Sequence, residues 1–323
     1  MHRFIDKIWY GYHPLRWVLL PFSIVYRFIT ALRRRYLHRY QQQPFSVPIV
    51  VVGNLTMGGA GKTPLVIALV RQFQAKGLRV GIVSRGYGAG ARVFPYEVKA
   101  DADAAFVGDE PLLLAKKTGC PVVIAPKRNL AVQYLIDLYQ SQIIISDDGL
   151  QHYAMSRAIE IVVIDGMRGL GNRLCLPAGP LREAPQRLKT VDFVVVNGGE
   201  WPDAYRMDCT PGEITGLLTG KTIPIAALKK PVAAIAGIGN PQRFFALLKA
   251  MGLVFKAYSF ADHHQFQPED LCVNEKTVVM TEKDAVKCES FASESMFYLP
   301  VDATLTDKFW DALWMHQQLK GLK

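Results

Sequence analysis

Cysteine is scarce in this chain of 323 residues, and its five copies lie far apart, at Cys120, Cys175, Cys209, Cys272 and Cys288. No two of them are spaced as C-x-x-C, so the sequence indicates neither a zinc site of that kind nor a disulfide framework. A reducing, cytosolic environment fits this pattern. The length and the 50% share of apolar residues allow two domains with sizeable cores.

Acidic residues are almost missing from residues 1–48, where Asp6 stands alone against eight lysines and arginines. This segment therefore carries +7 of the chain's net charge of +10, and the rest of the chain is close to neutral. A basic balance confined to one end does not indicate a general nucleic-acid surface. We expect no nucleic-acid partner.

Residues 14–32 are strongly apolar and aromatic, and Arg33–Arg35 follow directly. A spanning helix needs about 20 largely uncharged residues, but Arg16 and Arg27 interrupt this run and Pro21 would kink a helix unless it lay near the start. The mixture favours an amphipathic helix lying in the interface of an anionic leaflet, with the arginines on the cytoplasmic side. No small-residue cleavage site of a signal peptide follows. The alternatives are a helix packed on the protein's own core and, less well supported, a basic arm for nucleic acid.

Short β-branched runs recur along the chain and predict buried strands. They lie at residues 48–52, 80–84, 121–124, 143–146, 159–164, 193–196, 232–236 and 277–280. Helical stretches between them predict an α/β fold with a mostly parallel sheet covered by helices on both faces. We expect an N-terminal membrane-associated segment at 1–44, a nucleotide-binding domain at 45–222 and a smaller α/β domain at 223–323.

Residues 53–63 read GNLTMGGAGKT and connect the first strand to a helix, which is the context of a P-loop. Glycines let backbone amides surround phosphate oxygens, and the helix N-terminus adds partial positive charge. Thr56 replaces the first glycine of the motif, so a plain glycine-rich turn is the alternative. The predicted nucleotide contacts are Thr56, Gly58, Gly59, Ala60, Gly61, Lys62 and Thr63, and Thr63 would also hold Mg²⁺.

Acidic residues follow two of the predicted elements. Asp147 and Asp148 end a strand, where a P-loop enzyme places the carboxylate that holds Mg²⁺. Asp109 and Glu110 open a helix before Pro111, so Asp109 is either a simple N-cap or a general base or metal ligand at the nucleotide.

Three further segments leave alternatives open. Asp262 and His263 either orient an imidazole for proton transfer, form a loop pair without a role, or belong to a metal site. Residues 281–284 (TEKD) resemble a guanine-reading pattern but equally suit a charged helix start. Arg182 beside Glu183 either stabilises phosphate charge or forms a surface ion pair.

Together these stretches closely resemble the tetraacyldisaccharide 4'-kinases of lipid A biosynthesis, over residues from about 50 to 290. The matching segments are GNL with GGAGKT at 53–63, SRGYG at 84–88, GDEP at 108–111, DDGLQH at 147–152, PLRE at 180–183, DHH at 262–264 and TEKDA at 281–285. The substitution by Thr56 is shared by this family's style of P-loop.

The resemblance implies transfer of the γ-phosphate of ATP to the 4'-hydroxyl of a tetraacylated glucosamine disaccharide 1-phosphate. It implies work at the cytoplasmic face of the inner membrane of a Gram-negative cell, as a peripheral or monotopic protein that we expect to be a monomer. It makes Asp109 and His263 a base dyad supported by Asp262. The other implied roles are Mg²⁺ binding by Glu110, Asp147 and Asp148, and nucleotide or phosphate contacts by Gln151, His152 and Arg182.

Two other functions compete with this one. A nucleotide-dependent switch or metallochaperone at the membrane would use the same P-loop and would form no phosphorylated product. A kinase for a soluble small molecule would leave the N-terminal segment unexplained, except as core packing.

Overall fold

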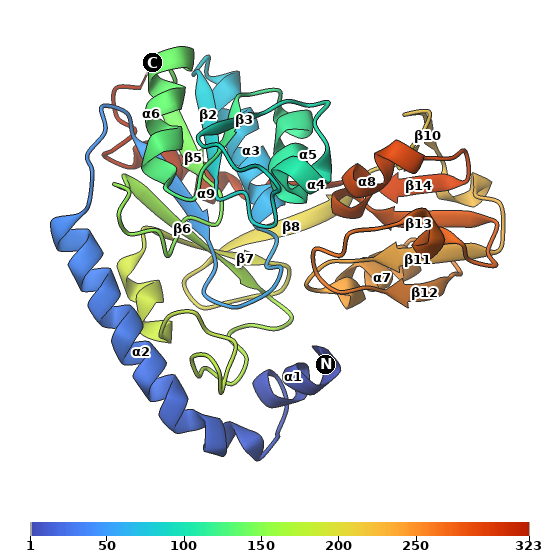
Figure 1. The fold of residues 1–323 in the computed structure, drawn as a ribbon, viewed down its shortest axis with the longest axis horizontal. Coiled ribbons are helices and arrows are strands. Elements are labelled where there is room, and N and C mark those ends of the chain that lie inside the picture. Colours follow the sequence, from blue (N-terminus) through green and yellow to red (C-terminus); the bar gives the residue numbers. More distant parts are fainter. Residues whose placement is uncertain (1, 323) are drawn as a thin grey trace.

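The computed structural model describes residues 2–322, which form two separate β-sheets (Figure 1). The larger sheet has nine strands in the order β15-β8-β7-β6-β1-β5-β2-β4-β3. These are β1 (Ile49–Gly53), β2 (Val80–Ser84), β3 (Tyr96–Val98), β4 (Val122–Ile124), β5 (Ile143–Ser146), β6 (Ile159–Asp165), β7 (Phe193–Asn197), β8 (Tyr205–Pro211) and β15 (Val301–Leu305). The edge strands β15 and β3 pair antiparallel, and every other pairing is parallel.

Helices cover both faces of this sheet because its central strands are buried on both sides. In β1, Val50 and Val52 pack with α3 (Lys62–Ala75), α5 (Asp109–Thr118) and α9 (Asp307–Met315). The alternate residues Ile49 and Val51 pack on the other face with α6 (Arg128–Tyr139), as the two-residue period of a strand requires. The predicted parallel α/β sheet with helices on both faces is confirmed.

The smaller sheet has the order β10-β9-β14-β13-β11-β12. Its strands are β9 (Ile214–Gly216), β10 (Thr222–Ile223), β11 (Val232–Ala236), β12 (Lys256–Ser259), β13 (Thr277–Thr281) and β14 (Met296–Leu299). Helix α7 (Pro241–Ala250) follows β11, and α8 (Glu282–Cys288) follows β13. The remaining helices are α1 (His2–Trp9), α2 (Leu15–Tyr40), α4 (Ala104–Val107) and the short 3₁₀ turns η1 (Pro185–Thr190), η2 (Ile225–Ala227), η3 (Pro268–Leu271) and η4 (Glu289–Phe291).

The expected domain bounds of 44, 222 and 323 stay a prediction, but the sheets divide the chain at different points. Strand β9 already belongs to the smaller sheet before residue 222. After β14 the chain returns, so that β15 pairs with β8 and Phe309 of α9 enters the core of the larger sheet. The smaller sheet is thus inserted between β8 and β15 of the larger sheet, and the residues after β14 belong to the larger sheet again.

Helix α2 runs along the outside of the molecule, away from both sheets (Figure 1). It continues through Pro21, and Ser23 is its one buried residue. Ser23 Oγ donates to the Cys175 carbonyl at 2.8 Å and accepts from the Ala178 amide at 2.9 Å. Most of the large apolar side chains of α2 are exposed to solvent. By length and composition this helix could cross a membrane. The exposure of these side chains contradicts the alternative of a helix that packs an apolar face on the protein's own core.

Candidate active site

The P-loop lies between β1 and α3, and its conformation depends on glycine at residue 61. Gly61 has φ +91°, and a Cβ there would lie 1.9 Å from Asn197 Nδ2. Asn197 sits at the end of β7 and donates from that nitrogen to the Ala60 carbonyl at 3.0 Å. A residue at the end of β7, two strands away from β1, therefore fixes the loop at the N-terminus of α3, where backbone amides can bind phosphate.

Lys62 is buried in this loop and points at acceptors of the same site. Its Nζ lies 3.4 Å from Asn54 Oδ1 and 3.5 Å from Asp148 Oδ1. Arg182 Nη1 contacts both oxygens of Asp148 at 3.0 Å. Burial raises the pKa of Asp148, but Lys62 and Arg182 hold it well below its usual range. The structure thus brings the predicted residues Lys62, Asp148 and Arg182 together and keeps the carboxylate ionised.

Asp147 differs from its neighbour, because it is buried and its carboxylate has no ion-pair partner within 4.0 Å among residues 2–322, although Arg128 donates to its backbone carbonyl at 3.0 Å. Burial, and then the charge of Glu110, raise the pKa of Asp147 to about 7. Neither of its carboxylate oxygens has a hydrogen-bond partner within residues 2–322. A buried carboxylate with unused oxygens is what a hard cation would satisfy.

A magnesium ion fits this end of the cavity when phosphates supply the other ligands. In the described part of the chain no three His, Cys, Asp or Glu side chains are grouped as a complete metal site. Mg²⁺ in kinases is held by one or two carboxylates plus substrate phosphates, so Asp147 with Thr63 suffices. Glu110, the third predicted carboxylate, instead accepts from Lys283 Nζ at 2.8 Å.

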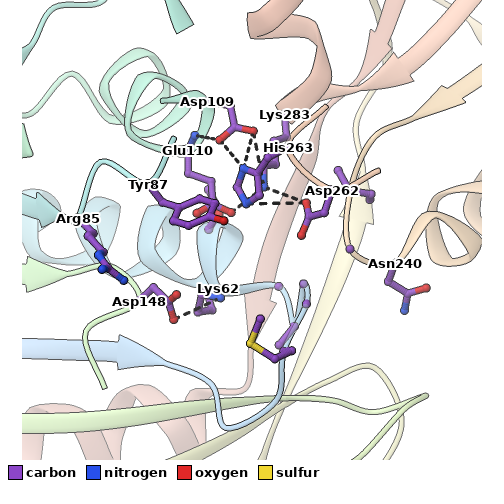
Figure 2. Close-up of a pocket in the computed structure, with 18 of the residues that line it drawn as sticks. Lys62, Arg85, Tyr87, Asp109, Glu110, Asp148, Asn240, Asp262, His263 and Lys283 are labelled. Atoms are coloured by element: carbon purple, nitrogen blue, oxygen red, sulfur yellow. Dashed lines mark hydrogen bonds and ion pairs between the residues drawn. The ribbon is translucent and has the colours of Figure 1, made fainter. Parts of the chain in front are cut away.

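Asp109 and His263 meet across the gap between the two sheets (Figure 2). His263 Nδ1 lies 3.0 Å from Asp109 Oδ2 and 3.1 Å from Oδ1. Burial raises the pKa of Asp109, but the His263 hydrogen bond and Lys283 bring it to about 2. The same hydrogen bond raises the pKa of His263 above its ordinary 6.5. Asp109 is not the N-cap of α5, because that position is Gly108 and Asp109 is the first helical residue. Its side chain accepts from the Glu110 amide at 2.8 Å in addition to contacting His263.

The two residues beside this pair have different partners. Asp262 Oδ1 lies 3.9 Å from His263 Nε2 and 3.5 Å from Lys283 Nζ. His264 turns away, and its Nε2 bonds Asp270 Oδ2 at 2.9 Å. His263 also has φ +58°, a backbone region that few side chains occupy and that often marks functional sites.

Gln151 and His152 lie behind the P-loop. Gln151 Nε2 donates to the Asn54 carbonyl at 3.2 Å and to Glu183 Oε1 at 3.0 Å. Burial lowers the pKa of His152 to about 4, with Arg128 and Arg157 adding to the effect. Both line the cavity, and their roles as nucleotide or phosphate contacts stay predictions.

The guanine-reading alternative for residues 281–284 is wrong for a geometric reason. Asp284 is fully buried, and its Oδ2 accepts from the Gly237 amide at 2.9 Å and from the Thr281 hydroxyl at 2.7 Å. Thr281 caps α8 by accepting from the Asp284 amide. The segment is a helix start, and this carboxylate is not available to a base edge.

The smaller sheet reaches the P-loop through the loop after β11. A Cβ on Gly239 would lie 2.5 Å from the Gly59 amide nitrogen. Asn240 Nδ2 donates to Asp165 Oδ2 at 2.9 Å, and Arg168 Nη1 donates to the Gly239 carbonyl at 2.9 Å. These close contacts fix the second sheet directly over the phosphate-binding loop.

One cavity of about 1520 Å³ is lined by the P-loop, Asp148, Arg182 and the Asp109–His263 pair, and Asp147 lies buried directly beside Asp148 in the chain. Its walls also include Tyr10, which directly follows α1, and Arg33 of α2. Figure 2 shows Lys62 and Asp148 on one side, with Asp109, His263 and Lys283 joined on the other. The cavity can therefore place a triphosphate beside a proton acceptor, and residues of the N-terminal segment form part of its wall.

Sequence reasoning missed several residues of this site. Lys283 lies in the segment that suggested either a guanine-reading pattern or a helix start. Asn197, Asn240 and Arg243 belong to no motif that would mark them as site residues. Arg243 donates to the Asn197 carbonyl at 3.2 Å and also to its Oδ1.

Comparison with known proteins gives consistent matches. A family model described as Tetraacyldisaccharide-1-P 4'-kinase matches residues 15–318. The chain is 58% identical over 321 residues to the Tetraacyldisaccharide 4'-kinase of Legionella pneumophila (strain Lens), covering 99% of each. It is 47% identical over 315 residues to that of Shewanella sp. (strain MR-4), covering 96% of this chain and 93% of the relative.

A solved structure is also similar. It is described as the "apo" form of LpxK from Aquifex aeolicus in complex with ATP. The TM-score is 0.76 at 26% identity, and the match covers 94% of this chain and 99% of that one.

Proposed function

The chain belongs to the tetraacyldisaccharide 4'-kinase family, and from this membership we propose how its cavity carries out the reaction. The protein is an ATP-dependent kinase of lipid A biosynthesis that phosphorylates the 4'-hydroxyl of a tetraacyldisaccharide 1-phosphate. The observation that carries the mechanism is the His263–Asp109 hydrogen bond in the same cavity as Lys62.

In the proposed mechanism the P-loop amides and Lys62 bind the β- and γ-phosphates. Lys62 would exchange its contact with Asp148 for phosphate oxygens, and Arg182 would remain with Asp148. Bound magnesium, held by Thr63, Asp147 and Asp148, would neutralise phosphate charge. Thr56, Gly58, Gly59, Ala60, Gln151 and His152 complete the proposed nucleotide surroundings.

His263 acts as the general base. Its Nδ1 donates to Asp109, so Nε2 is free to accept the 4'-hydroxyl proton while that oxygen bonds to the γ-phosphorus and ADP leaves. The Asp109 carboxylate fixes the tautomer and stabilises the imidazolium that forms. A positioned base of this kind contributes about 100- to 10,000-fold. Asp262 Oδ1 lies 3.9 Å from Nε2, beyond hydrogen-bond distance, so its charge would stabilise the imidazolium after the proton transfer without occupying Nε2 before it.

The test of the function is transfer of label from γ-labelled ATP to a tetraacylated disaccharide 1-phosphate in detergent micelles. We expect label on the lipid only when acceptor and magnesium are both present. Label released only as free phosphate, with or without lipid, would favour a nucleotide-dependent switch. Equal transfer to a soluble sugar would favour a kinase for small molecules.

The acid limb of the pH–rate profile should lie above pH 6.5, because the hydrogen bond with Asp109 raises the pKa of His263. Below this pKa the imidazole is protonated and cannot act as a base, so activity rises with pH. In Asp109→Asn the limb should move to lower pH while the maximal rate falls. A limb that stays in place in this variant would exclude His263 as the group that titrates. Measuring kcat/KM from pH 5 to 9 decides this.

We also propose that α2 lies in the cytoplasmic interface of the inner membrane and that the protein works there as a monomer, without a nucleic-acid partner. The support is the outward stripe formed by Trp17, Val18, Phe22, Ile24, Val25, Phe28, Ile29 and Leu32. The opposite side of the helix is bonded to the protein through Ser23 and Tyr26. A helix held along one side suits an interfacial position better than a spanning one.

Replacing Phe22 and Phe28 with aspartate should weaken binding to anionic vesicles by at least about 100-fold. Each side chain is 64% exposed, and burying a phenylalanine gains about 1.5–3 kcal/mol. The matched control is Leu218→Asp, which changes a 56% exposed residue near the smaller sheet. Co-sedimentation with vesicles measures both. Equal losses in the two proteins would contradict an anchor on α2.

A further inference from the structure

The start of α8 has no role in the proposed reaction, yet it reaches the base dyad. The Thr281 hydroxyl donates to Asp284, and Asp284 also accepts from the Gly237 amide, so the helix start is fixed to the loop that contacts the P-loop. This arrangement explains why the segment is ordered. It does not explain why two lysines of the same helix turn toward Asp109.

Lys283 and Lys287 are four residues apart and therefore lie on one face of α8. Lys283 Nζ is 3.8 Å from Asp109 Oδ2, and Lys287 Nζ is 3.9 Å from the same oxygen. The side chains of Lys287 and Asp109 are only 1% and 4% exposed. The buried Asp109 carboxylate thus contacts His263 and lies within 4.0 Å of two lysine ammonium groups.

Lys283 connects three carboxylates at once. Its Nζ is 2.8 Å from Glu110 Oε1 and 3.5 Å from Asp262 Oδ1, in addition to Asp109 (Figure 2). Glu110 belongs to α5 of the larger sheet, whereas Asp262 belongs to the smaller one. The Lys283 ammonium group therefore connects carboxylates from the two sheet regions that contribute Asp109 and His263.

We propose that Lys283 and Lys287 are positioning residues for the phosphoryl transfer, which fix the Asp109 carboxylate so that it orients His263. The inference deepens the proposed function and rests on the base dyad. Two cations on one helix face hold a carboxylate in one rotamer far better than solvent does, and a buried charge needs such partners. Because both lysines come from the smaller sheet, the dyad is complete only when the two sheets meet.

A purely structural role is the competing explanation. Lys117 bonds Glu282 at 2.9 Å nearby, and Lys116 pairs with Glu289, so α5 and α8 have other ion pairs. If Lys283 only joined the helices, its loss would destabilise the protein and lower activity independently of His263. If it acts through the dyad, its effect must vanish once His263 is gone.

The experiment is a double-mutant cycle of Lys283→Met and His263→Ala in the full chain, with Lys283→Arg as the conservative variant. The exposed Lys276→Met, just before β13, is the control. Lys287→Met would leave Asp284 buried without a cation, so Lys283 carries the test. The readouts are kcat for transfer to the lipid acceptor, the Kd for ATP, and the melting temperature.

We expect Lys283→Met to lower kcat about 10- to 100-fold and Lys283→Arg to recover most of it, with Kd for ATP within about threefold. Added to His263→Ala, Lys283→Met should lower kcat by less than about threefold. The positioning role would be overturned if Lys283→Met lowered kcat by the same factor with and without His263. It would also be overturned if Lys283→Met left kcat unchanged. An inactive wild type would instead overturn the proposed function, so the two failures are distinct.

Discussion

Replacing His263 with alanine should lower kcat by about 100- to 10,000-fold, which is the usual contribution of a general base. The sugar hydroxyl is a weak nucleophile, and no other imidazole lies beside Asp109 in the described residues. ATP affinity should change by no more than a few fold, because His263 contacts Asp109 and not the P-loop. Single-turnover transfer and ATP titration separate the two effects.

The neighbouring histidine provides a matched control. His264 has the same chemistry one residue later, but it bonds Asp270 and packs on Phe260. His264→Ala should retain kcat within a few fold. Normal turnover in His263→Ala would remove the dyad from the mechanism, and equal losses in both variants would indicate damage to the loop itself.

Replacing Lys62 with alanine should lower kcat/KM by about 1,000-fold. A fixed cation at the transferring phosphate is worth about 100- to 1,000-fold in rate, and lost nucleotide binding adds to this. The variant also leaves the partly exposed Asp148 with Arg182 as its remaining ion-pair partner in the described residues. Both kcat and the Kd for ATP should therefore worsen, unlike the result expected for His263→Ala.

Lys76, at the other end of α3, is the control for this change. It is exposed, and its Nζ lies 5.7 Å from the centre of the Trp314 ring. Lys76→Ala removes the same charge from the same helix and should leave kcat/KM within about twofold. A Lys62→Ala enzyme with unchanged ATP affinity and rate would contradict the phosphate-binding role of the loop.

The sequence was most informative where one short segment carries both structure and chemistry. The P-loop and the strand-ending Asp147 and Asp148 could be placed because parallel strands end at one edge of a sheet. The Val- and Ile-rich strands of the sheet centre were equally clear. By contrast, the edge strand β15 and its neighbour β8 contain polar, half-exposed residues, so their sequences lack the apolar run of a buried strand.

Contacts between distant segments explain what the sequence left open. The Asp109–His263 pair joins residues 154 positions apart, and only the family resemblance connected them. Lys283 and Asn197 act through partners on other elements, so no local pattern marks them. The segment Thr281–Asp284 shows the opposite case. Its local pattern suited both guanine recognition and a helix start, and the burial of Asp284 excludes guanine recognition.

The return of the chain to the larger sheet has a mechanical consequence. The smaller sheet is attached by two crossings, one after β8 and one before β15, and Gly212 in the first donates to the Pro300 carbonyl in the second at 2.9 Å. Two hydrogen-bonded connections restrict rotation of the smaller sheet relative to the larger one more than a single connection would. Cutting the chain after residue 299 would therefore not trim the smaller sheet, because it would strip an edge strand and α9 from the nucleotide-binding half.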